Sequence, residues 1–244
     1  MRLVELTAPV LGARCVVVVG DGGQAVVVDA GAGVAARVLA LVEREHLDVR
    51  GVLATHGHVD HTWDAGPLAA QLGVPVLLHQ ADRYRLADPW GTLGVLGAPS
   101  GRQDGPLAAV LRQVGLDPTD YVEPPWVTTF GAVPGADGRS LDDDLGSLLG
   151  VPDLHLVARH APGHTEGSTL YLLDADGPAP VVLAGDVLFA GSIGRTDLPG
   201  GDQRVMARTL RDVVRALPAA ARVLPGHGPA TTMAAELVTN PYLG

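Results

Sequence analysis

The chain has 244 residues, 47% of them apolar, which is enough to bury a core in one large or two small domains. Its formal net charge of −10 argues against nucleic acid as the main partner, because binding a phosphate backbone requires many basic side chains. No apolar stretch approaches the roughly 20 residues that span a bilayer, so we expect no membrane partner. A single cysteine, Cys15, and an N-terminus unlike a signal peptide predict a cytoplasmic protein.

The first part of the chain is expected to alternate strands with one helix. Two β-branched runs, Cys15–Val19 and Gln24–Asp29, flank a Gly-rich turn and predict adjacent antiparallel strands. Apolar residues at helical spacing predict a helix from Val34 to His46. A buried strand over Gly51–Ala54 then ends directly before a loop rich in histidine. Loops at strand ends are where functional side chains often collect.

The last part repeats this order. Strands are expected over Ser168–Leu173 and Val181–Ala184, a helix over Gln203–Leu217 and a further strand over Arg222–Leu224. The fold class expected from this repeat is α/β (α+β), a four-layer αββα sandwich in which two ββαβ halves pack face to face. Their strand ends would converge on one cleft.

Between these parts lies a segment, Pro89–Asp153, that is rich in Gly, Pro and Asp. It is too irregular to predict a second domain, and we expect a long insert over the cleft. We therefore predict a single domain over residues 1–244. In the insert and nearby, Trp90, Trp126 and Phe189 are candidates for an apolar wall, and Asp64 for a helix cap.

Three histidines and an aspartate fall within six residues: His56, His58, Asp60 and His61. Imidazole nitrogens mixed with a carboxylate oxygen suit zinc, iron or manganese. In an extended segment His56 and His58 point the same way, whereas Asp60 and His61 follow a bend and can reach a second ion. This one loop therefore predicts ligands for two metal ions.

Three later residues complete this pattern. His164, Asp186 and His227 each lie beside a glycine, where the backbone turns sharply after an apolar strand. Each alone fits an ordinary turn residue and a ligand equally well, but the three together with the histidine loop make a metal site the better interpretation.

Through Thr55-His-Gly-His-Val-Asp-His61 and these three residues, in this order, the chain resembles the metallo-β-lactamase superfamily. The resemblance implies two divalent metal ions, most simply zinc, with iron or manganese as alternatives. It implies the following ligands: His56, His58 and His164 for the first ion, Asp60, His61 and His227 for the second, and Asp186 bridging both. It further implies that Asp29 supports the histidine loop from behind by hydrogen bonding.

The run from Gly185 to Asp197 resembles the glyoxalase II group, the hydroxyacylglutathione hydrolases, and in particular their short single-domain relatives. An Asp at position 186 separates the chain from true β-lactamases, which the resemblance implies would carry Cys there. Arg195 and Asp197 are expected to pair and to fix this loop behind the ligands.

The resemblance implies a metal-dependent hydrolase in which a metal-bound hydroxide attacks a thioester, the S-acyl conjugate of a small thiol. Asp60 and Asp186 are the candidate catalytic residues. Two alternatives stay open: a persulfide dioxygenase with a single iron, and a lactone or ester hydrolase on the same site. The expected partner is thus a small molecule, and the sequence makes no prediction of oligomeric state.

Overall fold

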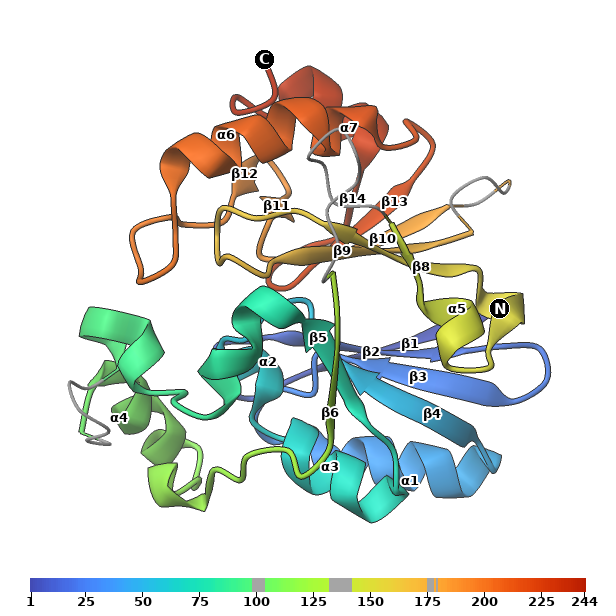
Figure 1. Ribbon diagram of the computed structural model, residues 1–244, viewed down its shortest axis with the longest axis vertical. Coiled ribbons are helices and arrows are strands. Elements are labelled where there is room, and N and C mark those ends of the chain that lie inside the picture. Colours follow the sequence, from blue (N-terminus) through green and yellow to red (C-terminus); the bar gives the residue numbers. More distant parts are fainter. Residues whose placement is uncertain (98–103, 132–141, 175–177, 179) are drawn as a thin grey trace.

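Two six-stranded sheets pack face to face, with helices on their outer faces, in this computed structural model of the chain (Figure 1). The structure describes residues 1–97, 104–131, 142–174, 178 and 180–244. The expected four-layer αββα sandwich is confirmed. Within the described residues, no helix is long and apolar enough to cross a membrane.

The first sheet has the order β1-β2-β3-β4-β5-β6. Strands β1 to β3 are antiparallel, whereas β3 to β6 run parallel to one another. The bounds are β1 (Arg2–Thr7), β2 (Arg14–Val19), β3 (Gln24–Val28), β4 (Asp48–Leu53), β5 (Val76–His79) and β6 (Val127–Phe130).

The second sheet has the order β14-β13-β10-β9-β8-β7, and only β10 and β13 are parallel. The bounds are β7 (Asp143–Asp144), β8 (Leu156–His160), β9 (Thr169–Leu173), β10 (Val181–Gly185), β13 (Arg222–Pro225) and β14 (Thr231–Thr232). A separate two-stranded hairpin is formed by β11 (Leu188–Phe189) and β12 (Ser192–Ile193).

Helices α1 and α3 cover the outer face of the first sheet, and α6 and α7 cover that of the second (Figure 1). The α-helices are α1 (Ala35–Glu45), α2 (Val59–Thr62), α3 (Ala65–Leu72), α4 (Pro106–Gln113), α5 (Leu145–Leu148), α6 (Gln203–Asp212) and α7 (Met233–Thr239). The described 3-10 helices are η1 (Gln80–Leu86), η2 (Gly91–Leu96), η4 (Pro118–Asp120), η5 (Pro152–Leu154) and η6 (Val214–Ala216).

The two halves of the sandwich share one local order. In the first, β2 and β3 are antiparallel, α1 follows, and β4 returns parallel to β3. In the second, β9 and β10 are antiparallel, α6 follows, and β13 returns parallel to β10. The same ends of β4 and β13 therefore carry the histidine loop and His227, as the repeat in the sequence predicts.

Side chains that alternate along each strand pack into two apolar layers, one on each face of the sheet. On β2, Val16 and Val18 pack between the sheets, whereas Val17 and Val19 pack against α1 and α3. Because side chains alternate across a strand, a continuous run of valines buries both faces of the sheet.

The segment 89–153 is more regular than expected. It supplies β6 and β7, the edge strands of the two sheets, and helix α4. Strand β6 pairs with β5, its neighbour in space but not in local sequence, so composition alone did not reveal it. Only part of this segment therefore lies outside the sandwich.

Asp64 directly precedes α3, but its side chain caps α1. Its Oδ2 accepts hydrogen bonds from the backbone N–H groups of Gly33 (3.0 Å), Val34 (2.7 Å) and Ala35 (2.7 Å), at the start of α1. A carboxylate at a helix N-terminus satisfies free N–H groups and complements the helix dipole. Asp64 thus joins the segment after the histidine loop to α1.

Replacing Leu156 by Ala should destabilise the sandwich, because Leu156 is fully buried between the sheets. We expect the free energy of unfolding to fall by about 2 to 5 kcal/mol, from lost burial and the cavity left behind. The matched control is Leu148→Ala, a side chain 58% exposed, which should change it by about 0.5 kcal/mol or less. Urea unfolding at fixed metal concentration measures both, and equal losses would contradict the packing described here.

Candidate metal centre

All seven side chains expected to ligate metal lie together at one end of the sandwich. The histidine loop follows β4, His164 lies in the turn between β8 and β9, Asp186 directly follows β10, and His227 follows β13. Five of these residues thus come from loops at the ends of buried strands, where packing fixes the backbone, and Asp60 and His61 come from the short helix α2 that continues the segment after β4. Residues more than 160 positions apart, such as His61 and His227, come into contact.

The first ligand group consists of His56, His58 and His164, all buried. Nδ1 of His58 lies 3.0 Å from Nε2 of His56 and 2.9 Å from Nε2 of His164. Three ring nitrogens therefore point at one another from two loops.

The second group consists of Asp60, His61 and His227. Nε2 of His61 lies 3.1 Å from Nε2 of His227, which in turn lies 3.3 Å from Oδ2 of Asp60. Asp186 lies between the groups: its Oδ2 is 3.7 Å from Nε2 of His164 and 3.6 Å from Nε2 of His227. A carboxylate at this position can offer an oxygen ligand to an ion in either group.

The donor set fits a pair of transition-metal ions. Four of the five histidines use Nδ1 for an outer hydrogen bond, which leaves Nε2 facing the centre. Among the described residues, Oδ1 of Asp186 is buried without a hydrogen-bond partner. Imidazole nitrogens and carboxylate oxygens at these positions suit zinc, iron or manganese.

Electrostatics distinguish the two groups. Burial, helped by neighbouring histidines, lowers the pKa of His56 and His58 well below the usual range, so both are neutral. For His61 burial also acts to lower the pKa, but Asp60, Asp29 and Asp186 together outweigh it and raise the pKa to about 10. Without a metal ion, the second group therefore retains a proton at neutral pH.

Asp29 makes the hydrogen bonds that the sequence resemblance implied. It is 3% exposed, and its carboxylate accepts from the backbone N–H of Thr55 (2.7 Å), the Thr55 hydroxyl (2.8 Å) and Nδ1 of His61 (3.1 Å). Its φ of 57° lies in the left-handed region, which aspartate tolerates better than most residues. This strand end therefore orients both ends of the histidine loop.

The outer hydrogen bonds of His164 and His227 were not predicted. Nδ1 of His164 donates to the carbonyl oxygen of Arg195 (2.8 Å), and Nδ1 of His227 donates to that of Leu11 (3.0 Å). The expected pair between Arg195 and Asp197 is present, at 2.7 Å for each of two hydrogen bonds. The Arg195 side chain thus fixes a loop whose backbone orients His164, and backbone acceptors carry no signal in sequence.

A pocket of about 280 Å³ opens above both groups. Its polar side comes from the expected ligands and Arg195, and its apolar side largely from the insert. The apolar lining residues are Leu11, Leu93, Leu96, Pro106, Leu107, Val110 and Leu198. The insert therefore folds over the site, as expected.

The prediction that Trp90, Trp126 and Phe189 form an apolar wall of the site is wrong, because none of the three lines this pocket. Trp90 is buried and packs edge-to-face on Trp63, with ring centroids 6.1 Å apart. Trp126 is 57% exposed. Leucines of η2 and α4 take the place of these rings, and which side of an irregular segment faces the site depends on its tertiary packing.

Sequence comparison places the chain in one superfamily. The sequence model of the metallo-β-lactamase superfamily matches residues 8–227. An uncharacterised protein of Mycobacterium leprae is 35% identical over 244 residues, covering 100% of this chain and 99% of the relative. The hydroxyacylglutathione hydrolase GloC of Haemophilus influenzae is 29% identical over 233 residues, covering 94% and 92%.

Solved structures superpose on this chain over nearly its whole length. The BLEG-1 B3 metallo-β-lactamase superposes with a TM-score of 0.73 at 27% identity, covering 99% of each chain. TTHA1623, crystallised in a di-iron-bound form, superposes with a TM-score of 0.70 at 29% identity, covering 98% of this chain and 100% of that one.

Metal uptake by the second group should depend more strongly on pH than uptake by the first. Because the pKa of His61 is about 10, an ion entering there must displace a proton, whereas His56 and His58 are already neutral at pH 7. Between pH 9 and pH 7 we expect that binding step to weaken about tenfold or more per unit, with at least one proton released, because the pKa of His227 is raised as well.

Calorimetric zinc titrations in buffers of different ionisation enthalpy measure the released protons. In the variant His227→Ala, only the step with little pH dependence should remain. Equal proton release in both steps would contradict this assignment.

Proposed function

Because this chain belongs to the metallo-β-lactamase superfamily, we propose that it is a metal-dependent hydrolase that cleaves a thioester, the S-acyl conjugate of a small thiol. One observation carries the proposal: Asp186 lies between two adjoining ligand groups at the base of a pocket with one apolar side. When bound, two divalent ions, most simply zinc, would activate a water molecule and polarise the substrate carbonyl.

Asp60 is proposed to hold that water. Burial acts to raise its pKa, but His61 and a hydrogen bond from His227 outweigh burial and keep the pKa well below the usual range. Asp60 is therefore ionised at neutral pH, and it lines the pocket. An ionised carboxylate there accepts a hydrogen bond from the water and orients it toward the substrate.

The pocket walls suit the two parts of a thioester. Leu93, Leu107 and Leu198 offer apolar contact to the acyl portion. Arg195 lines the same pocket with a side chain 45% exposed, and we propose that its guanidinium, while paired with Asp197, also contacts an anionic carrier such as glutathione or another small thiol. A thiol, with a pKa near ~8.5, leaves as thiolate without a dedicated general acid.

The similarity to a hydroxyacylglutathione hydrolase over nearly the whole chain supports this substrate class. A lactone or ester would meet the same groups, and a persulfide dioxygenase would need one iron. These two activities are the alternatives that the experiment must separate.

The test is an assay of metal-loaded protein on a panel of 2-hydroxyacyl thioesters of glutathione, mycothiol and coenzyme A. We expect thiol release, lost with a chelator and restored by zinc. Asp186→Asn should lower kcat/KM by about 100-fold or more, since it removes the charge between the ligand groups. The control Asp21→Asn changes a carboxylate 86% exposed in the β2–β3 turn, and should leave kcat/KM unchanged.

The same panel includes a lactone, an aryl ester and glutathione persulfide. Hydrolysis of the lactone or ester alone would replace the thioester proposal with one of the alternatives. Oxygen uptake with the persulfide would move the assignment to a dioxygenase.

A further inference from the structure

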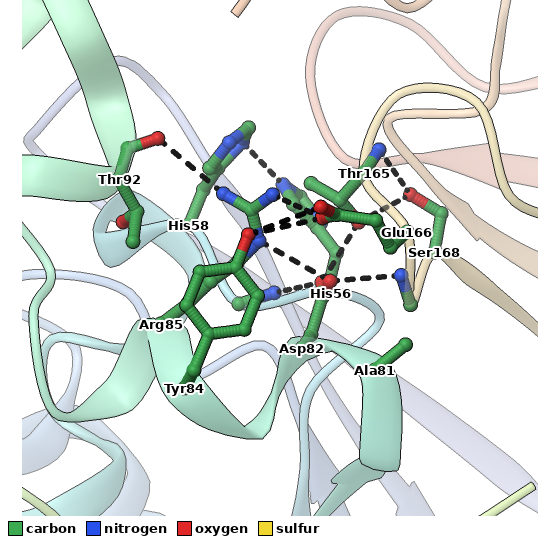
Figure 2. A network of polar contacts seen from close by, with 12 residues as sticks. His56, His58, Ala81, Asp82, Tyr84, Arg85, Thr92, Thr165, Glu166 and Ser168 are labelled. Atoms are coloured by element: carbon green, nitrogen blue, oxygen red, sulfur yellow. Dashed lines mark hydrogen bonds and ion pairs between the residues drawn. The ribbon is translucent and has the colours of Figure 1, made fainter. Parts of the chain in front are cut away.

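An ion pair with no exposed side-chain surface lies beneath the candidate metal centre. Asp82 and Arg85 both belong to η1, directly after β5, and both side chains are 0% exposed. Nε of Arg85 lies 3.2 Å from Oδ1 of Asp82 (Figure 2). Removing two charges from water is costly, and apolar residues of the same size often stabilise a core as well. Such a pair therefore calls for an explanation beyond stability.

Asp82 joins the two loops that carry the first ligand group. Its Oδ2 accepts from the backbone N–H of Gly57 (2.8 Å) and from the Thr165 hydroxyl (2.7 Å), and its Oδ1 accepts from the backbone N–H of Gly167 (2.8 Å). Gly57 lies between His56 and His58, and Thr165 directly follows His164. One carboxylate thus fixes the relative position of all three histidines.

Arg85 joins the same assembly to the pocket wall. Its guanidinium donates to the carbonyl oxygens of Pro199 (2.9 Å) and Thr92 (3.4 Å) and to Oε2 of Glu166 (2.5 Å), as Figure 2 shows in part. Thr92 precedes Leu93, and Pro199 follows Leu198, and both leucines line the pocket.

The backbone is shaped to receive the pair. A Cβ atom on Gly57 would lie 2.7 Å from Cβ and 2.8 Å from Cδ of Arg85. A Cβ atom on Gly167 would lie 2.6 Å from Cγ of Asp82. Both loops therefore approach the pair too closely for any side chain, and the pair fills the space between them.

We propose that Asp82 and Arg85 are positioning residues that set the geometry of the first ligand group and hold the apolar pocket wall against it. Asp82 would determine how tightly that group binds metal. Arg85 would affect both metal binding and the fit of the acyl portion, the latter resting on the proposed function. Neither residue lines the pocket, so both act through the loops that they join.

The experiment uses cobalt(II) as the probe, because its visible absorption reports ligand geometry. Asp82→Asn and Arg85→Met keep the approximate size of each side chain and remove its charge. We expect cobalt affinity of the first group to fall about 10- to 100-fold with an altered absorption band, because partners that orient a ligand tune metal affinity to this extent. Affinity of the second group should stay unchanged.

The matched control is Glu236→Gln, which removes the charge of another buried carboxylate. Glu236 accepts from the backbone N–H of Gly191, the Thr231 hydroxyl and the side chain of Asn240, away from the pocket. This variant should lose thermal stability yet keep the cobalt spectrum and affinity of the unchanged protein.

Substrate kinetics give the second readout. Arg85→Met should raise KM for an acyl thioester about tenfold or more and should change kcat less. Arg85→Lys keeps the charge but lacks the planar guanidinium, so it should restore the wild-type KM only in part. If a buried variant fails to fold, Glu166→Gln, at a side chain 44% exposed, should give a smaller shift in the same direction.

Wild-type cobalt affinity and spectrum in Asp82→Asn and Arg85→Met, with only the loss of stability seen in Glu236→Gln, would overturn the proposal. The cobalt readout needs no substrate. A protein that cleaves no thioester but shows the cobalt shift would refute the proposed function and support the positioning role.

Discussion

The geometry of the candidate metal centre depends on one constraint: buried histidine side chains are held with their ring nitrogens in contact. Nε2 of His56 lies 3.0 Å from Nδ1 of His58, and Nε2 of His61 lies 3.1 Å from Nε2 of His227. Ring nitrogens so close repel one another when both carry protons or both present lone pairs, so a cation between them, or a single shared proton, is needed. The carboxylates supply the opposite charge: Asp186 lies between the groups, and the raised pKa of His61 records the local excess of negative charge. Hydrogen bonds to Asp29 and to backbone carbonyl oxygens hold these groups in place against their repulsion.

The fold holds them through buried carboxylates at strand ends. Asp29, at the end of β3, fixes Thr55 and His61, whereas Asp82, after β5, fixes Gly57 and the turn after His164. Neither carboxylate is left unpaired, since each accepts at least three hydrogen bonds, which offset the cost of burying a charge. These partners lie in segments that follow strands of the first sheet or join strands of the second. The geometry of the ligand groups is therefore coupled to the packing of the two sheets. The pocket wall belongs to the same system, through the contacts of Arg85.

Local patterns predicted the sandwich and the residues that gather at its end as candidate ligands, and tertiary contacts explain what these patterns missed. The ββαβ repeat follows from alternation and helical spacing, which are properties of neighbouring residues, and the ligand residues are recognisable by type and by their place after strands. Strand β6 is only four residues long, and its pairing with β5 is non-local. Arg85 could be noticed only as a charged residue after a buried strand, because its partner Pro199 is 114 positions away. The wall of the pocket was assigned to the wrong residues for the same reason.

The seven side chains are proposed to hold two metal ions. Metal content measured by elemental analysis and native mass spectrometry, on protein purified without added metal, tests it most directly. We expect about two ions per chain, drawn from zinc, iron or manganese, with both ligand groups filled. A single tightly bound ion in the group of His56, His58 and His164, with the other group still empty after excess metal is then added at pH 8, would contradict the two-metal assignment.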